Sequence, residues 1–372
     1  MKLSIVIIGL SITSSWGNGH ATTYRALAKA LSNRGHSVNF LERDVPWYRE
    51  HRDMPHADYC RIDLYDSLPE FARRHAARVR DADLVILGSY VPDGIAIGEW
   101  LTSNATGVTA FYDIDTPVTL ASLEANNASY ISPRLIPRFD LYLSFSGGPA
   151  LGIIEDLYGS PLTRALYCSA EVNGEAISGA EKWSLGYLGT YSEDRQPGLE
   201  SLLLAPAQRL PEQSFVVAGP KYPESVRWPA NVTYIPHLPP NEHPSFYTSQ
   251  RYALNLTRSD MKALGFSPSV RLFEAAACGT PVISDDWPGM ETVFTPGKEI
   301  LIAASPRDVV QILSDVPEDR RLEIAANARA RFLKEHTPEQ RVRQLETYYQ
   351  EALAHRPASK TARLASEFEE VK

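Results

Sequence analysis

The chain has 372 residues, 44% of them hydrophobic and 22% charged, and a formal net charge of −8 at pH 7. This length exceeds what one hydrophobic core usually holds and favours two compact domains. The acidic surplus argues against binding to nucleic acids or generally to anionic membranes, because phosphate groups attract clustered Lys and Arg. No apolar run approaches the roughly 20 residues that span a bilayer, so we expect no transmembrane segment and leave only a peripheral membrane contact open.

The cysteines and the first residues favour a cytoplasmic protein. Cys60, Cys168 and Cys278 lie far apart and lack the spacing of a metal site or a disulfide framework. The opening run MKLSIVIIGL imitates a signal peptide, but its charged segment is thin and no A-x-A cleavage site follows. We therefore interpret this run as a buried first strand.

The first half alternates short apolar runs with helical patterns, which is typical of βαβ units around a parallel sheet. The expected strands are Ser4–Gly9, Ser37–Leu41, Leu84–Gly88, Val108–Tyr112 and Leu141–Phe145. Apolar residues at helical spacing predict a helix over His20–Arg34, which Gly35 ends.

A glycine-containing turn, Trp16-Gly17-Asn18-Gly19-His20, joins the first strand to this helix. Glycines let backbone N–H groups approach a ligand there, and a helix N-terminus favours an anion. The turn lacks the G-x-G-x-x-G pattern of dinucleotide-binding proteins, and Glu42 is the only acidic residue near the end of the second strand. Ligand binding and a plain tight turn, capped by His20, are equal alternatives.

Asp113 and Asp115 follow the strand that ends near Tyr112. Asp115 can accept a proton or bind a sugar hydroxyl. It can also cap the helix that begins at Thr116, or the Asp-x-Asp pair can bind a divalent metal. Capping is the stronger alternative, and without a third acidic ligand we predict no metal site.

The second half repeats the scheme after a less regular link at Val172–Lys182. Its expected strands are Leu185–Leu188, Ser214–Ala218, Val232–Ile235, Tyr252–Leu256 and Val282–Ser284. Ser305 and Thr337 carry the start signals of two late helices. The polar end, residues 357–372, is expected to be a flexible tail.

Two motifs near the starts of helices in the second half are candidate ligand-binding motifs. In the loop Leu188–Arg195, Gly189 and Thr190 can offer backbone donors to a diphosphate, and Arg195 adds a planar cationic fork. Arg258 follows a strand and is a candidate for a phosphate or sugar contact. For both arginines a solvated loop position is the competing interpretation.

The proline-rich loop in Asn231–Pro240 could read a nucleobase edge through the main chain near His237 and Leu238. A lone histidine in a loop is more often structural.

The run Ser267–Asp286 places two charges on a mostly apolar helix. Ser267 is the expected N-cap and Gly279 the expected end. Arg271 and Glu274 share one face of this helix, since residues three or four apart are neighbours. A polar face on an otherwise buried helix predicts a ligand contact.

These motifs resemble those of GT-B glycosyltransferases, in particular the CgeB-like group related to spore maturation proteins and, more distantly, the large retaining group-one family. The resemblance spans most of the chain. It is most specific in SPSVRLFEAAACGTPVISDD, clear in SWGNGHATTYRAL and FYDIDTPVT, and faint after Leu313.

The resemblance implies an α/β GT-B fold, with two doubly wound Rossmann-like domains facing across a cleft. Residues 1–175 would form the acceptor-side domain, and residues 183–337 the nucleotide-sugar-binding domain. The last helix, residues 338–356, would pack back on the first domain.

The resemblance also implies roles for individual residues. Glu274 would hold the ribose hydroxyls, because a carboxylate can accept from both at once. The residues expected near the diphosphate or donor sugar are Gly189, Thr190, Arg195, Arg258, Ser269 and Arg271. Those expected near the transferred sugar or acceptor are Gly17, Gly19, His20 and Asp115.

One departure concerns the donor sugar. The wider family has a Glu-x7-Glu pattern, but Phe266 stands where the first glutamate is usual. The substitution is consistent with the CgeB-like group and leaves the identity of the sugar open.

The leading hypothesis is a metal-independent, retaining glycosyltransferase that uses a nucleoside diphosphate sugar as its donor substrate and needs no other cofactor. The acceptor can be a saccharide, lipid, protein or small metabolite. The alternatives are a nucleotide-sugar epimerase and a non-catalytic sugar-nucleotide-binding protein. A dinucleotide dehydrogenase is disfavoured by the missing glycine pattern.

Overall fold

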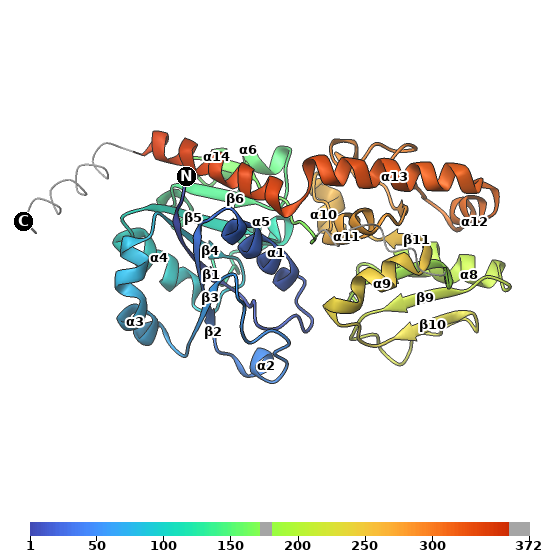
Figure 1. Cartoon of the computed structure of the whole chain (residues 1–372), viewed down its shortest axis with the longest axis horizontal. Coiled ribbons are helices and arrows are strands. Elements are labelled where there is room, and N and C mark those ends of the chain that lie inside the picture. Colours follow the sequence, from blue (N-terminus) through green and yellow to red (C-terminus); the bar gives the residue numbers. More distant parts are fainter. Residues whose placement is uncertain (172–180, 357–372) are drawn as a thin grey trace, which may run out of the picture. The chain divides into compact units, whose positions relative to one another are not determined.

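The computed structural model describes residues 1–171 and 181–356, and the chain divides into two compact units (Figure 1). The N-terminal unit is Met1–Tyr167 with the chain from Arg341 onward, and the C-terminal unit is Cys168–Gln340. Most of the predicted link Val172–Lys182 and the predicted tail, residues 357–372, lie outside the described residues.

The N-terminal unit is built on a parallel sheet. Its strands are β1 (Ser4–Gly9), β2 (Ser37–Arg43), β3 (Arg61–Tyr65), β4 (Leu84–Gly88), β5 (Val108–Asp113), β6 (Leu141–Ser144) and β7 (Thr163–Ala165). They lie in the order β3-β2-β1-β4-β5-β6-β7. The chain winds outward from β1 to β3 and then returns to β4, so the winding reverses between β1 and β4.

Helices cover both faces of this sheet. They are α1 (His20–Asn33), α2 (Pro46–Arg49), α3 (Leu68–Asp81), α4 (Gly94–Asn104), α5 (Thr116–Glu124), η1 (Ile136–Arg138), α6 (Pro149–Asp156) and α14 (Pro338–His355). Figure 1 shows α3 and α4 on one side of the central strands and α1 on the other. Val6 and Ile8 of β1 pack with Phe71 of α3, whereas Ile5 and Ile7, equally buried, lie on the opposite face because side chains alternate along a strand.

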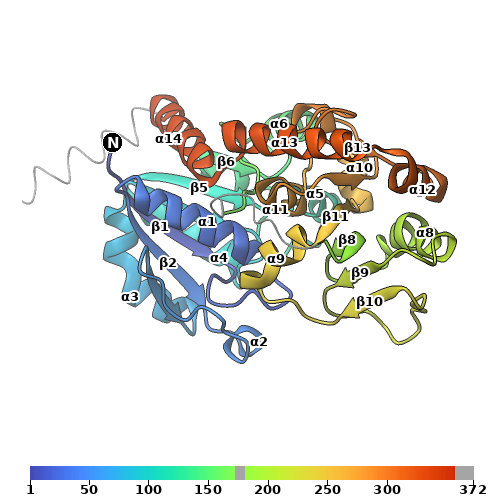
Figure 2. The same cartoon turned by 45° about the vertical axis from the view of Figure 1, so that its right-hand side comes forward.

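The two ends of the described chain meet in this unit. Helix α14 lies beside α1, and Figure 2 shows α1 crossing in front of β1 and β2. Glu346 of α14 accepts from Nη2 of Arg34 over 2.6 Å and pairs with Nε2 of His36 over 3.0 Å. Tyr348 also donates to the backbone oxygen of Ala165 in β7 over 3.1 Å. These contacts join the last helix to a unit whose other elements end at Tyr167.

The C-terminal unit has a second parallel sheet. Its strands are β8 (Trp183–Leu188), β9 (Phe215–Ala218), β10 (Val232–Ile235), β11 (Gln250–Asn255), β12 (Val282–Ser284) and β13 (Leu301–Ile302). Their order is β10-β9-β8-β11-β12-β13, so the winding reverses between β8 and β11.

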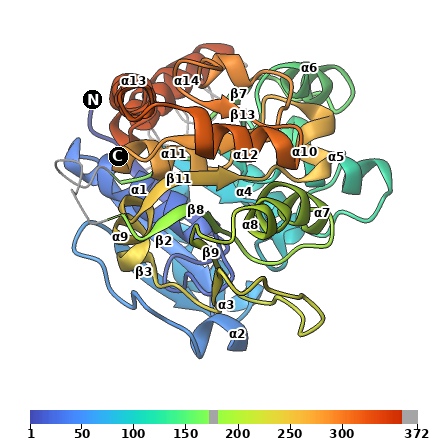
Figure 3. The same cartoon turned by 90° about the vertical axis from the view of Figure 1, so that its right-hand side faces the viewer.

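The helices of the C-terminal unit also lie on both faces of their sheet (Figure 3). They are α7 (Gln196–Leu199), the π-helical turn η2 (Glu200–Leu204), α8 (Ala205–Arg209), η3 (Pro240–Glu242), α9 (His243–Thr248), α10 (Ser259–Leu264), α11 (Val270–Cys278), η4 (Met290–Thr292), α12 (Pro306–Asp315) and α13 (Glu318–Glu335). The continuous segment α7-η2-α8 packs with α12 on one face, where Leu203 and Val309 share a buried cluster with Leu185 of β8. Helices α9 and α11 lie on the other face.

The predicted pair of doubly wound α/β units is confirmed. Every expected strand is present, and Ser305 forms a capping box with Asp308 at the start of α12. The predicted cap at Ser267 is wrong, because α11 begins at Val270 and the Ser267 hydroxyl instead donates to the Gly265 carbonyl over 2.8 Å. Gly279 ends α11 with a left-handed φ of 74°, as predicted.

Candidate active site

The candidate residues gather where the winding of each sheet reverses. At such a point the loops leaving two neighbouring parallel strands diverge, which opens a crevice at the carboxyl ends of the strands. In the N-terminal unit the loops after β1 and β4 leave this point, and in the C-terminal unit the loops after β8 and β11 do so. Each unit therefore carries its own group of candidate residues, called its half-site below, and the two groups are described separately.

Glu42 shapes the glycine turn of the N-terminal unit. Its buried carboxylate accepts from the backbone N–H groups of Ile12 and Thr13 over 2.8 and 3.0 Å, and from the Thr13 and Ser11 hydroxyls over 2.6 and 3.0 Å. These four hydrogen bonds satisfy the Glu42 carboxylate within the protein. Glu42, the nearest candidate for a ribose ligand in the sequence, thus holds the loop that leads into the turn.

The turn itself is open. Gly17 has a φ of +60°, a conformation that favours glycine, and no atom lies within 4 Å of where a Cβ would stand on Gly17 or Gly19. Asn18 accepts from the backbone N–H of His20 over 3.1 Å through its side chain, and His20 is the first residue of α1. The space above both glycines is consistent with the predicted ligand contact.

His20, Tyr90 and Asp115 come together at the carboxyl ends of β1, β4 and β5. The rings of His20 and Tyr90 have centroids 5.5 Å apart, and the Tyr90 hydroxyl donates to Oδ2 of Asp115 over 2.8 Å. Burial and the negative charge of Asp115 raise the pKa of Tyr90 far above its usual value, so Tyr90 stays protonated and keeps donating. Asp115 occupies the N-cap position of α5, but its side chain makes no capping bond.

Burial lowers the pKa of His20 to about 4. The imidazole is therefore neutral near pH 7, and its Nδ1 is buried without a hydrogen-bond partner among the described residues. A neutral ring suits hydrogen bonding to a hydroxyl better than electrostatic binding of a phosphate.

Asp113, the other acidic residue of the pair, is fully enclosed. It accepts from the hydroxyls of Tyr142 and Thr119, each over 2.7 Å. Burial outweighs these bonds and raises its pKa to about 6. Asp113 anchors β5 to β6 and α5, while Asp115 is the member of the pair that meets Tyr90.

Glu274 organises the half-site of the C-terminal unit. Its Oε1 lies 3.2 Å from Nδ1 of His243, and its Oε2 accepts from the Tyr247 hydroxyl over 2.9 Å. His243 also forms a hydrogen bond with the backbone of Leu238. The structure thereby links Glu274 on α11, through α9, to the loop predicted to read a nucleobase.

Glu274 and His243 each stabilise the charged form of the other. Burial alone would raise the pKa of Glu274, but the hydrogen bond and charge of His243 and the bond from Tyr247 outweigh it, so the net pKa is lowered. Burial alone would lower the pKa of His243, but its bond to Glu274 and the charge of that carboxylate raise it overall. Glu274 is therefore held ionised near pH 7.

Arg271 is buried, with 6% of its surface exposed, and is bound within the unit. Its Nε donates to the Leu188 carbonyl over 2.7 Å and its Nη1 to Oδ1 of Asn255 over 2.8 Å, and its guanidinium lies 4.6 Å from the Tyr187 ring centroid. Ser269 donates to the same Asn255 oxygen over 2.7 Å. Arg271 and Ser269 thus tie the carboxyl ends of β8 and β11 together at the reversal point.

The loop after β8 is tightly packed. A Cβ on Gly189 would stand 2.6 Å from the Tyr187 hydroxyl and 2.9 Å from Nη2 of Arg271, so any other residue would force these side chains to shift. Arg195 donates from Nη2 to the Thr190 carbonyl over 2.8 Å and thereby closes the loop.

The other predicted residues lie on loops of the same unit. Arg258 pairs with Asp194 over 3.7 Å, and the backbone N–H of Ser259 donates to the same carboxylate over 3.2 Å. His237 is exposed, whereas Leu238 packs against the apolar cluster on the α9 face.

Several residues that complete these half-sites were not predicted from the sequence: Tyr90, His243, Tyr247 and Asn255. His243 and Tyr247 are four residues apart on α9, a spacing that puts both on one helix face, but only the packing of α9 on α11 reveals their common partner. Asn255 could have been predicted as a site residue, because it is a polar residue at the carboxyl end of a buried strand.

Within residues 1–171 and 181–356, no three Asp, Glu, His or Cys side chains cluster in a way that could hold a metal ion. In the same ranges no helix is both long and apolar enough to cross a membrane.

Comparisons with known proteins agree with this architecture. Residues 195–347 match the family described as glycosyl transferase-like. No curated protein sequence matches the chain. Among solved structures, a sucrose-phosphate synthase from Thermosynechococcus elongatus is similar with a TM-score of 0.68 and 16% identity, over 95% of this chain and 100% of that chain.

Two further structures have the same degree of similarity. HepE from Anabaena, in complex with UDP-glucose, matches with a TM-score of 0.68 and 15% identity over 95% of this chain and 99% of its own. An alpha-glucosyltransferase in complex with UDP-glucose and DNA matches with a TM-score of 0.68 and 13% identity over 94% of this chain and 100% of its own. The chain thus has the GT-B fold, and its residues 195–347 are similar to the glycosyl transferase-like family.

Proposed function

We propose that the protein is a glycosyltransferase that moves a sugar from a nucleoside diphosphate donor to an acceptor. The observation that carries this proposal is the ionised, enclosed carboxylate of Glu274, held by His243 and Tyr247 inside the glycosyl transferase-like domain. Each carboxylate oxygen has a second lone pair, so Glu274 can accept from both ribose hydroxyls while keeping its protein partners.

The donor to test first is UDP-glucose, because two of the structurally similar proteins were solved in complex with it. Support within this chain comes from the loop that contains Leu238, which lies next to Glu274 through His243. A ribose at Glu274 would bring its base toward the backbone of this loop. The acceptor can be a saccharide, lipid, protein or small metabolite.

The chemistry would rest on electrostatic stabilisation of the departing diphosphate. Arg195 and Arg258 border the loops at the winding reversal of the C-terminal unit, and backbone N–H groups at Gly189 and Thr190 add donors. Arg271 would act by fixing these loops, since Leu188 and Asn255 already engage its guanidinium. Metal independence, retention of configuration and membership of the CgeB-like group are parts of this proposal.

His20 and Asp115 would meet the transferred sugar or the acceptor. The low pKa of His20 makes it a poor general base near pH 7 and a suitable hydrogen-bond partner for a hydroxyl. Asp115, fixed by Tyr90, is the better candidate for a base if the reaction inverts configuration.

A second candidate function is a sugar-nucleotide-binding protein without turnover. Phe266 favours it, because an aromatic ring replaces the glutamate that the wider family uses for the donor sugar. Phe266 has a φ of 50° and its backbone N–H donates to the Pro288 carbonyl over 2.7 Å, so this position is a fixed part of the loop before α11.

The test is a thermal-shift panel of UDP, GDP, dTDP, CDP and their sugars, followed by an assay of nucleotide release with and without candidate acceptors. Binding to the native state raises its stability by mass action. Stabilisation by one nucleotide together with acceptor-dependent release supports the transferase. Stabilisation without turnover over the whole panel supports the binding protein, an isomerised donor indicates an epimerase, and no stabilisation by any nucleotide contradicts all three.

A further inference from the structure

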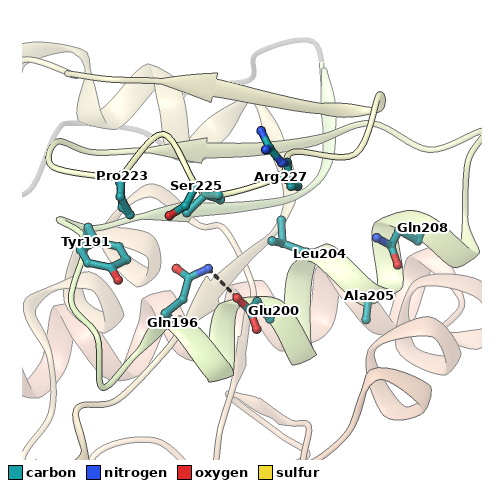
Figure 4. A pocket seen from close by; sticks show the side chains of 10 residues that line it. Tyr191, Gln196, Glu200, Leu204, Ala205, Gln208, Pro223, Ser225 and Arg227 are labelled. Atoms are coloured by element: carbon teal, nitrogen blue, oxygen red, sulfur yellow. Dashed lines mark hydrogen bonds between the residues drawn. The ribbon is translucent and has the colours of Figure 1, made fainter.

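The C-terminal unit contains a pocket of about 530 Å³ that none of the predicted site residues lines (Figure 4). This volume is typical of small-molecule sites. One wall comes from the helical segment α7-η2-α8, and the other from the loop after β9, which contributes Pro223, Ser225 and Arg227. Tyr191 stands at one end, where Figure 4 shows its ring beside the amide of Gln196.

The helical wall presents residues four positions apart: Gln196, Glu200, Leu204 and Gln208. In a regular α-helix, the first and last of these residues, twelve positions apart, would be rotated by about 120° about the helix axis and would spread around a third of its surface. The π-helical turn Glu200–Leu204 takes up one extra residue, which reduces this rotation to about 20°. The turn therefore aligns these side chains along a single pocket wall.

Pro206 accounts for the π-helical turn. It cannot donate to the carbonyl four residues earlier, and its ring would clash with that carbonyl in a regular helix. The π-helical turn thus aligns two amides and a carboxylate in a polar stripe along the pocket wall. Such turns are frequent at functional sites.

The chemistry of the lining favours a neutral, hydroxyl-rich ligand. Glu200 and Arg227 balance each other in charge, so the pocket offers an anion no net attraction. Nε2 of Gln196 donates to Glu200 over 3.0 Å, which orients the amide, while Oε1 of Gln196 is buried and has no partner among the described residues. A buried acceptor without a partner is costly, and a ligand hydroxyl would satisfy it once the Gln196 side chain turns toward the pocket.

Tyr191 supplies the complementary apolar surface. Its ring makes an edge contact with Tyr222, with centroids 5.5 Å apart, which holds it in place. A fixed aromatic ring beside amide, carboxylate and hydroxyl groups matches a sugar ring, which has C–H faces and a rim of hydroxyls.

We propose that this pocket is a second, non-catalytic binding site for a neutral oligosaccharide. It differs from the half-site at Glu274, because the pocket lies on the α7–α8 face of the sheet and Glu274 lies on α11 at the other face. Tyr191 and Gln196 adjoin the loop proposed to bind the diphosphate, so binding of saccharides and binding of UDP are measured separately.

The test applies the fluorescently labelled full-length protein to an array of neutral, acidic and amino-sugar oligosaccharides, with a peptide array beside it. Calorimetry with the best-bound saccharide then compares the wild type with Gln196→Ala and Gln208→Ala. Each variant removes hydrogen-bonding groups from the helical wall, and we expect each to weaken binding at least about fivefold. Glu224→Ala is the matched control, because Glu224 is exposed on the opposite loop between two lining residues but does not line the pocket.

Selective binding of neutral saccharides, weakened by both wall variants and unchanged in Glu224→Ala, supports the site. The UDP-induced thermal shift of Gln208→Ala should equal that of the wild type. Binding of no saccharide, binding that both wall variants leave unchanged, or binding only of acidic saccharides or of peptides would overturn the proposal. Because Gln208 is exposed, its substitution leaves the fold intact, which the melting curve verifies.

Discussion

The hydroxyl of Tyr247 on α9 donates a 2.9 Å hydrogen bond to Oε2 of Glu274 on α11. With His243 at the other oxygen, this bond fixes the plane of the carboxylate and therefore the direction of its remaining lone pairs. The orientation of the proposed ribose acceptor is thus set by a neighbouring helix.

Replacing Glu274 with Ala should abolish most of the thermal shift that the bound nucleotide produces, because the acceptor for the ribose hydroxyls is lost. Tyr247→Phe should weaken nucleotide binding only about fivefold, since it removes one orienting hydrogen bond, of about 1 kcal/mol. Calorimetry with UDP measures both. Glu291→Ala, an exposed acidic residue of the same unit, serves as the control, and undiminished binding by Glu274→Ala would show that the site is misassigned.

The pair of His243 and Glu274 should make stability depend on pH. The folded pKa of His243 is raised, so its contribution is complete below the unfolded value of about 6.5 and is lost as pH rises through the folded pKa. The folded pKa of Glu274 is lowered, so its contribution is lost only in acid. Melting temperatures of the wild type and His243→Gln should differ most near pH 5 to 6.5, by roughly 3–6 °C, and converge toward pH 9.

A difference between these two proteins that grows with rising pH would contradict this assignment. His56→Gln is a suitable control, because His56 is exposed and forms no part of either half-site.

Arg271 should contribute mainly to the stability of the fold rather than to ligand binding. Arg271→Ala leaves the Leu188 carbonyl and Asn255 without their donor in a buried setting, and we expect a loss of about 3 kcal/mol in the free energy of unfolding. Arg271→Lys should recover part of this loss. Urea unfolding, with the exposed Arg209→Ala as control, measures it, and an Arg271→Ala variant as stable as the wild type that loses only nucleotide binding would assign Arg271 to the ligand instead.

The fold was predictable because most of its strands are continuous apolar runs between turn residues. Strand β3 escaped prediction because Arg61–Tyr65 is an edge strand whose Arg61 is exposed, so its sequence reads RIDLY rather than an apolar run. Strand β13 has only two residues. Both are formed by pairing with a neighbour, which local sequence does not encode.

The candidate site was predictable only at the ends of those strands. Glu274 was found because a charge on an apolar helix is conspicuous, whereas its partners His243 and Tyr247 depend on how two helices pack. Tyr90 has a φ of 63°, a conformation set by its surroundings rather than by its residue type. Arg271 was found for the same reason as Glu274, but its sequence could not disclose that Leu188 and Asn255 would occupy its donors.

His20 should cause part of the stability that the N-terminal unit loses in acid. Its folded pKa of about 4 lies below the unfolded value near 6.5, so the unfolded chain binds more protons between these values and stability falls as pH drops from 6.5 to 4. His20→Gln should remove up to about 3 kcal/mol of this loss, because glutamine does not titrate. Melting curves from pH 7.5 to 4.5 for the wild type, His20→Gln and the exposed control His56→Gln measure the effect. Parallel curves for the wild type and His20→Gln would mean that the His20 ring protonates as easily in the folded protein as in the unfolded chain, and would restore it as a candidate base.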